Sequence, residues 1–119
     1  MALNAYITAD GKEMGHAQAV QAWAANIEPR VEMNPILLKP QGDMTSQVIL
    51  MGTAVGRVQA ADYYRDYFDR GWAAITSCLD KLAAEFDYIV CEGAGSPAEI
   101  NLKHRDLTNM RVASYLQAN

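Results

Sequence analysis

The sequence predicts an α/β fold built on a parallel sheet, and three observations support this prediction. Short apolar runs that end at a charged residue and a chain breaker alternate with longer stretches of helical periodicity. One run, 88–91, is followed by Glu92 and then by Gly93-Ala94-Gly95, an arrangement typical of ligand-binding edges in open α/β sheets. Two further apolar runs within 46–56 flank a Met-Gly-Thr turn, which predicts a β-hairpin at the sheet edge.

The first predicted helix covers 18–27, after a polar turn that contains Asn4 and Asp10 and ends before Glu13. Strong helix formers dominate this stretch, and its large apolar residues recur at steps of three and four. Pro29 is expected to end the helix. Its two polar residues one turn apart, Gln18 and Gln21, are interpreted as solvated surface groups.

Two buried strands are predicted, at 36–38 and at 88–91. Lys39 follows the first strand. Two interpretations stay open for it: contact with a phosphate or a carboxylate, or ordinary solvation. Glu92 follows the second strand, and the glycines after it allow a close approach of backbone or phosphate. Several polar residues lie just beyond, more than a simple connector needs.

The second half of the chain is predicted to be helical over 60–86 and again over 107–117, with Asp106 as the cap of the last helix. Gly71 is a point where the longer helix bends or splits. Its second half carries one apolar stripe, and its first half a tyrosine-rich cluster interpreted as packing. The stripe consists of Ile75, Leu79, Leu82 and Phe86.

Composition excludes several classes of protein. The chain has 119 residues, half of them apolar, and a formal net charge of −4 without a basic stripe, which argues against a nucleic-acid partner. It lacks an apolar run of membrane-spanning length and a signal-peptide pattern, so a cytoplasmic location without a membrane partner is expected. Cys78 and Cys91 fit neither a disulfide framework nor a zinc spacing and are interpreted as reduced core residues.

The number of strands is too small for a complete parallel sheet. Only two core strands and one hairpin are visible, whereas a parallel sheet needs further strands and cover on both faces. Residues 1–119 are therefore predicted to be a single partial domain. Exposed sheet edges in such a domain favour association with another copy, so a homo-oligomer is a further expectation.

Several motifs resemble the synthetase domain of the glutamine-dependent adenosylcobyric acid synthase family. The most specific is residues 92–102, Glu-Gly-Ala-Gly-Ser-Pro-Ala-Glu-Ile-Asn-Leu. The others are Asp-Gly-Lys-Glu at 10–13, Ala-Gln-Ala at 17–19, Met-Asn-Pro-Ile-Leu-Leu-Lys-Pro at 33–40 and Ser-Gln-Val at 46–48. The resemblance covers essentially the whole chain, which would be the central part of the ATP-dependent synthetase domain.

The resemblance implies a fold and a chemistry. The fold would be a partial three-layer, parallel-sheet, P-loop-like domain of the dethiobiotin-synthetase type, with the β-hairpin at its edge. The family uses ATP and Mg²⁺ to activate carboxylates of adenosylcobyrinic acid a,c-diamide, a corrinoid, and ammonia from a separate glutaminase domain then forms the amides. Such activation requires metal and cationic charge around the phosphates.

Residue roles follow from the same resemblance. Glu92 and Lys39 would be catalytic, with Glu92 also a magnesium ligand and Glu13 and Asp10 the next candidate ligands. Gly93 and Gly95 would lie at the nucleotide. The corrinoid side would be formed by five polar residues, Asn4, Ser96, Glu99, Asn101 and Asp106.

The chain also departs from the family. It has no Gly-x-x-x-x-Gly-Lys-Ser/Thr loop and no glutaminase nucleophile, and His16 stands where the family has arginine. The chain alone is therefore expected to bind ATP poorly and to be inactive. Two alternatives stay open: a related ATP enzyme, such as cobyrinic acid a,c-diamide synthase or dethiobiotin synthetase, and a non-catalytic, self-associating fragment.

Overall fold

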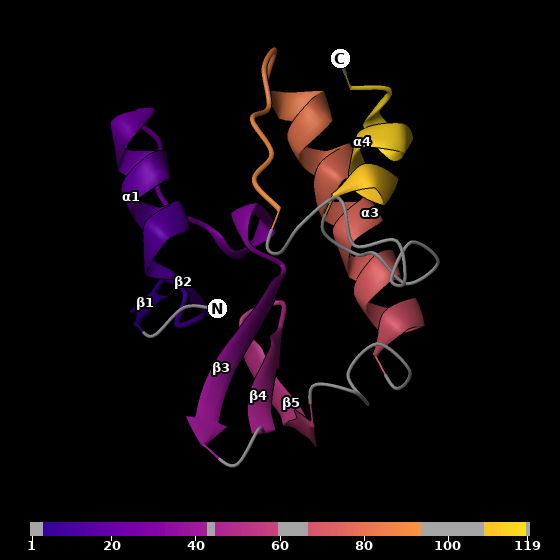
Figure 1. The fold of residues 1–119 in the computed structure, drawn as a ribbon. Coiled ribbons are helices and arrows are strands. Elements are labelled where there is room, and N and C mark those ends of the chain that lie inside the picture. The colour runs from indigo at the N-terminus through magenta and orange to yellow at the C-terminus, as the bar shows by residue number, and fades with distance from the viewer. Residues whose placement is uncertain (1–3, 43–44, 60–66, 94–108, 119) are drawn as a thin grey trace.

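The computed structural model describes residues 4–42, 45–59, 67–93 and 109–118, which form an α/β fold with two small antiparallel sheets (Figure 1). The elements in chain order are β1 (Ala5–Ile7), β2 (Glu13–Gly15), α1 (His16–Ala24), the 3₁₀ turn η1 (Val31–Met33), β3 (Ile36–Gly42), β4 (Thr45–Leu50), β5 (Thr53–Gln59), α3 (Phe68–Glu85) and α4 (Met110–Leu116).

The first sheet is a hairpin of β1 and β2, which the sequence did not predict because each strand has only three residues. Tyr6 pairs with Met14 in its register, and Met14 is fully buried. Helix α1 follows β2 directly, and Tyr6 packs edge-on against Trp23 with ring centroids 5.2 Å apart. The hairpin and α1 therefore form one unit. The helix ends at Ala24, earlier than predicted, and Asn26 then has a φ of 57°.

The second sheet has the order β3-β4-β5, and both pairings are antiparallel. The predicted hairpin is confirmed as β4 and β5, joined by Met51 and Gly52, whose φ values of 50° and 79° suit a tight hairpin turn. The predicted parallel sheet is wrong. Only residues 43 and 44 separate β3 from β4, whereas a parallel connection needs a dozen or more residues.

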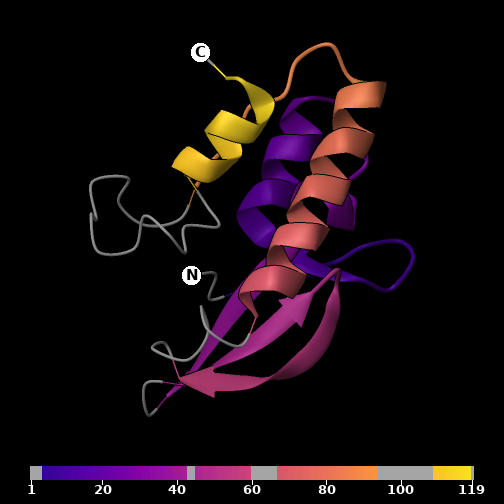
Figure 2. The same cartoon turned by 90° about the vertical axis from the view of Figure 1, so that its right-hand side faces the viewer.

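Helix α3 packs across one face of this sheet (Figure 2). The predicted apolar stripe is confirmed in Ile75, Leu79 and Leu82, which are buried, and the helix continues without interruption through Gly71. The main core joins the sheet, α3 and α4, and its buried members are Val48, Val58, Ile75, Leu79 and Val112. The predicted last helix is confirmed as α4, but its predicted cap, Asp106, lies outside the described residues.

The segment 87–93 corrects a second prediction. Residues 88–91 were expected to form a buried strand, but the segment pairs with no strand among the described residues, and Tyr88 and Val90 are 92% and 97% exposed. Figure 1 shows it running between α1 and α3. An extended segment becomes a strand only when neighbouring strands accept and donate its backbone hydrogen bonds.

Within the described ranges, no helix has both the length and the apolar character needed to cross a membrane.

Candidate functional site

The candidate site is centred on an ion pair between two strands of different sheets. Lys39 in β3 places its Nζ 2.5 Å from Oε1 of Glu13 in β2. Their side chains are 33% and 20% exposed, so the pair is accessible but partly shielded from water. The structure thus brings together the predicted catalytic lysine and one predicted metal ligand, which are 26 residues apart in the sequence.

The turn before Glu13 is held by Thr8, which is buried. Its Oγ1 donates a hydrogen bond to Asp10 Oδ1 at 2.5 Å and accepts one from the Lys12 backbone N–H at 2.9 Å. Gly11 has a φ of 79°, a conformation that favours glycine, and its N–H donates to the Thr8 carbonyl at 2.9 Å. The carboxylate of Asp10 is therefore oriented by the turn and not by Glu13 or Lys39.

The same turn touches the β4–β5 turn. The Glu13 N–H donates to the Gly52 carbonyl at 3.1 Å, and a Cβ added at Gly52 would lie 2.5 Å from Lys12 Cβ. Only a glycine therefore permits this approach. Asn34 supports the opposite end of β2, because its Oδ1 accepts a hydrogen bond from the Gly15 N–H at 2.7 Å. These contacts hold Glu13 in place relative to β3.

Glu92 lies on the exposed segment 87–93. The Nε2 of Gln21 in α1 donates a hydrogen bond to Glu92 Oε2 at 2.9 Å, across 71 residues of sequence. Gln21 is exposed, as its interpretation as a solvated residue requires, and the structure adds a specific partner. No ion pair joins Glu92 to a cationic side chain among the described residues, and the amide of Gln21 is neutral.

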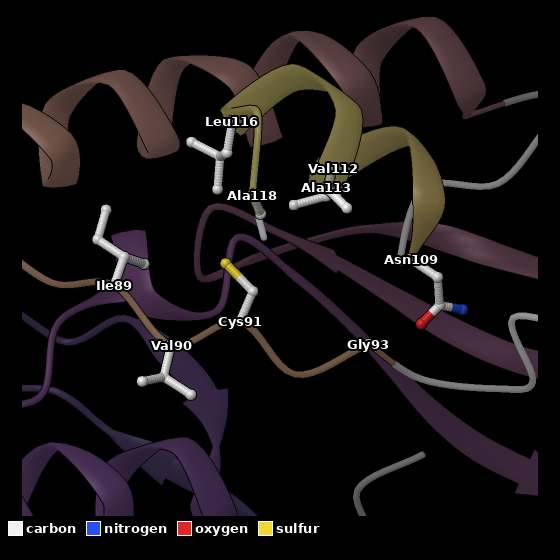
Figure 3. Close-up of a pocket in the computed structure, with 9 residues that line it drawn as sticks. All are labelled: Ile89, Val90, Cys91, Gly93, Asn109, Val112, Ala113, Leu116 and Ala118. Carbon is white, nitrogen blue, oxygen red and sulfur yellow. The ribbon is translucent and has the colours of Figure 1, made fainter.

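A pocket of about 400 Å³ lies between this segment and α4 (Figure 3). Gly93 lies at one end near Asn109, while Cys91 points toward α4 from the middle of the segment. The pocket is lined by Ile89, Val90, Cys91, Gly93, Asn109, Val112, Ala113, Leu116 and Ala118. Most of these side chains are apolar or small, so the pocket itself offers few groups for charged chemistry.

The remaining predicted site residues fall into two groups. Asn4 is exposed at the entry to β1, and its backbone carbonyl accepts a hydrogen bond from the His16 N–H at 3.4 Å. Five others, Gly95, Ser96, Glu99, Asn101 and Asp106, lie outside the described residues. Within the described part of the chain, no group of three or more His, Cys, Asp or Glu side chains could hold a metal ion. Glu92, Glu13 and Asp10 therefore do not form a shared metal centre there.

Sequence reasoning placed none of three residues that shape the candidate site in that site: Thr8, Asn34 and Gln21. Thr8 and Asn34 each lie next to a turn or a strand end, where short polar side chains commonly bond to backbone. This placement is a local signal that was available in the sequence. The partner of Gln21 is not, because nothing local to α1 indicates that Glu92 lies beside it.

The described candidate residues offer one cation, Lys39, and three carboxylates, of which Glu13 is paired with Lys39 while Asp10 and Glu92 have other partners. Lys39 can attract a phosphate or a carboxylate, and Glu13 limits the positions that its Nζ occupies. Glu92 offers hard oxygen atoms to a divalent cation.

Comparison with known proteins gives a consistent result. The cobyric acid synthase of Acaryochloris marina is 82% identical over 118 residues, which are 99% of this chain and 24% of that protein. Proteins of the same name from Synechocystis sp. and Microcystis aeruginosa are 75% and 76% identical with the same coverage. The chain thus spans about a quarter of the length of the curated relatives it matches. The resemblance predicted from the motifs is confirmed over the whole chain. No family model and no solved structure matches.

Proposed function

We propose that the chain is part of the amide-forming, ATP-dependent portion of a cobyric acid synthase. The substrate would be adenosylcobyrinic acid a,c-diamide, whose side-chain carboxylates become amides with ammonia from a glutaminase domain elsewhere in the enzyme. The observation that supports this most directly is the 82% identity over 118 residues to the A. marina protein of that name. Because the chain covers 24% of that protein, the activity is proposed for the longer enzyme.

Glu92 is the best candidate to hold magnesium. Magnesium commonly binds one or two carboxylates and completes its shell with phosphate oxygens and water. Glu92 is exposed and has a neutral hydrogen-bond partner, Gln21, so its charge is available to a cation. Glu13 is a weaker candidate, since its carboxylate already accepts a hydrogen bond from Lys39. Asp10 is likewise oriented by Thr8.

Lys39 is proposed to attract the negative charge that surrounds the reaction. ATP with Mg²⁺ would supply the phosphoryl group that makes a corrinoid carboxylate reactive toward ammonia. The role of Lys39 would be to hold a phosphate or carboxylate oxygen, while Glu13 fixes the lysine side chain. Gly93 and Gly95 would let phosphate approach the backbone. The proposed corrinoid contacts are Asn4, Ser96, Glu99, Asn101 and Asp106.

A chimera tests this function. The chain replaces the matching segment of the A. marina enzyme, and amide formation is measured with ATP and glutamine. We expect an active chimera, and a loss of about 100-fold in kcat for Glu92→Gln. The matched control is Glu28→Gln, the same chemical change at an exposed residue of the described structure. It should leave the rate unchanged.

Two outcomes would contradict the proposal at different points. A chimera that folds but forms no amides with any corrinoid carboxylate would reject the function. If the chimera is active and Glu92→Gln has the same rate of amide formation as Glu28→Gln, the proposed function stands but the proposed role of Glu92 is rejected. The 119-residue chain alone is expected to bind Mg²⁺–ATP poorly in calorimetric titration, and tight binding would show that it forms a nucleotide site without further chain.

A further inference from the structure

We propose that one polar face of the β3-β4-β5 sheet binds the acid and amide side chains of the corrinoid substrate. In this site, Arg57 holds a carboxylate that is still to be amidated. The inference rests on the proposed function for the identity of the substrate. It goes further because it assigns a binding surface to β4 and β5, two strands that contain none of the other proposed site residues.

The strand register places a row of polar side chains across the three strands, which lie side by side (Figure 1). Lys39 in β3 is opposite Gln47 in β4, and Gln47 is opposite Arg57 in β5. Residues directly opposite each other in neighbouring strands lie on the same face of a sheet. The pair Thr45 and Gln59 forms the next row on this face, because side chains alternate along each strand.

The residues between these two rows identify the face. Val58 in β5 and Val48 in β4 alternate with the polar residues, and both are buried in the core that includes α3. Gly56 is opposite Val48, and a Cβ added there would collide with the hydroxyl of Tyr67, which precedes α3. The polar rows therefore lie on the face that is turned away from α3.

The polar groups of this face are available to a ligand. Arg57 and Gln59 are exposed, and Gln47 is partly exposed. Among the described residues, no carboxylate forms an ion pair with Arg57, and the two glutamine amides have no hydrogen-bond partner. Lys39, by contrast, is paired with Glu13. Arg57 therefore supplies the unpaired positive charge of the described part of this face.

Protection of a sheet edge does not explain the pattern. Edge strands commonly carry charges that discourage pairing with another chain, and Arg57 lies in the edge strand β5. Gln47, however, lies in the central strand β4, where there is no edge to protect. A ligand that extends across the strands would contact both. Neighbouring strands are roughly 4.8 Å apart, so the row from Lys39 to Arg57 is about 10 Å long.

The chemistry of the face matches a ligand that carries both acids and amides. An arginine guanidinium binds a carboxylate through two parallel hydrogen bonds. A glutamine amide donates and accepts, so it can bond a carboxylate before amidation and a carboxamide after it. The proposed substrate presents both groups on the rim of one flat ring. Nucleotide phosphates match less well, because their sites commonly use backbone N–H groups of glycine-rich loops and helix N-termini.

Binding of two corrinoids to the chimera tests the inference. Adenosylcobyrinic acid a,c-diamide has more carboxylates than its amidated product, adenosylcobyric acid, and each is titrated by calorimetry without ATP. We expect Arg57→Gln to raise the Kd of the a,c-diamide about 10-fold or more, and that of the product less than about 3-fold. Gln47→Met should raise both Kd values by about 3- to 10-fold, because it removes a contact that both corrinoids make.

Two further variants control for charge and folding. Arg70→Gln makes the same chemical change at an exposed arginine of α3, away from the polar face, and should change neither Kd. Arg57→Lys keeps the charge but loses the paired hydrogen bonds, so the Kd of the a,c-diamide should lie between those of the unchanged chimera and Arg57→Gln. The Kd of Mg²⁺–ATP should stay the same in all of these variants.

Four results would overturn the inference. One is an unchanged Kd of the a,c-diamide in Arg57→Gln or in Gln47→Met, and another is an equal increase for both corrinoids in Arg57→Gln. The third is weaker binding of Mg²⁺–ATP alone, which would identify a nucleotide phosphate as the occupant. The fourth is a lower Tm of the Arg57→Gln chimera with unchanged corrinoid binding, which would identify an acidic segment of the enzyme itself.

These readouts do not require catalysis, so the two proposals can fail separately. An active chimera whose corrinoid binding is unaffected by Arg57→Gln rejects the polar sheet face alone. A chimera that binds the a,c-diamide through Arg57 but forms no amides rejects the proposed function alone.

Discussion

Lys39 and Glu13 join the two sheets of this protein through one ion pair, with 2.5 Å between Nζ and Oε1. Glu13 lies in a three-residue strand that has little core of its own, and Lys39 lies in the longer strand β3. The pair therefore has a structural task, which is to fix β2 against β3, besides the role proposed for it in phosphate or carboxylate binding.

The structural task of the pair can be measured in a double-mutant cycle. Glu13→Gln and Lys39→Met should each lower the free energy of unfolding, with a coupling energy of about 0.5–1 kcal/mol, the upper range for a partly exposed pair. Urea unfolding at low and high salt measures it, and the coupling should shrink as salt rises. Strictly additive single effects would show that the pair contributes nothing to stability.

Gly52 should tolerate alanine less well than Gly11. Both have a φ of 79°, but a Cβ at Gly52 would lie 2.5 Å from Lys12 Cβ, while one at Gly11 would meet nothing within 4 Å. Gly11→Ala should cost about 1 kcal/mol for the left-handed backbone alone. Gly52→Ala should cost roughly 2–3 kcal/mol, because the steric clash adds to the same backbone strain. Equal losses of unfolding free energy for the two variants, measured with urea, would mean that the turn at Lys12 and the turn at Gly52 do not touch in solution.

Glu32 should make stability depend on pH in the acid range. A hydrogen bond from Lys81 is the main cause that lowers the pKa of its carboxyl, and the charges of Lys81 and Arg30 add to it. Because the native pKa is lowered, the stabilisation is fully present above the ordinary value of 4.5 and is lost as pH falls through the native pKa. Thermal unfolding between about pH 6 and pH 3 measures this loss.

Lys81→Met should remove most of the pH dependence that Glu32 contributes. The matched control is Lys12→Met, which removes the same charge from a residue whose ammonium group contacts the hydroxyl of Thr53 and not a carboxylate. The control should show the same change of stability with pH as the wild-type chain. An equal change of stability with pH in Lys81→Met and the wild type would assign the pH dependence to other carboxyls.

The two cysteines should differ in reactivity. Burial, with the nearby charge of Glu32 as a smaller cause, raises the pKa of Cys78 to about 11, and its side chain contacts Met51 with the sulfur atoms 3.4 Å apart. Cys91 is exposed. A thiol reagent at pH 8 should therefore modify one thiol quickly, and Cys91→Ser should abolish that fast phase. Rapid loss of both thiols in the folded chain would show that the α3 core opens readily.

Much of the local structure was predictable from the residues alone. The hairpin of β4 and β5 follows from two apolar runs around Met51 and Gly52, and the buried face of α3 follows from the spacing of Ile75, Leu79 and Leu82. Both signals act over a few residues, so they do not depend on what packs nearby. The resemblance to cobyric acid synthases was likewise carried by sequence motifs, above all the run at 92–102.

The errors came from interactions between distant parts of the chain. The apolar run 36–38 was recognised as a strand, but its antiparallel pairing was missed, although the short connection to β4 contained the information. The run 88–91 has the composition of a buried strand and yet is exposed here, because burial depends on partners that the run does not contain. The ligand roles predicted for Glu13 and Asp10 stay predictions, and the structure adds that Glu13 accepts a hydrogen bond from Lys39, 26 residues away in the sequence.

By itself, the sequence determined where helices and turns form, which faces are apolar, and which enzymes the chain resembles. Only the tertiary structure decided that Glu13 meets Lys39, that Gln21 meets Glu92, and that no strand of the described residues pairs with 88–91. The physical reason is the distance along the chain over which each kind of interaction acts. Periodicity, turn conformation and capping act between neighbouring residues, whereas a strand partner or an ion pair is chosen when segments far apart in the chain compete for the same backbone groups and charges.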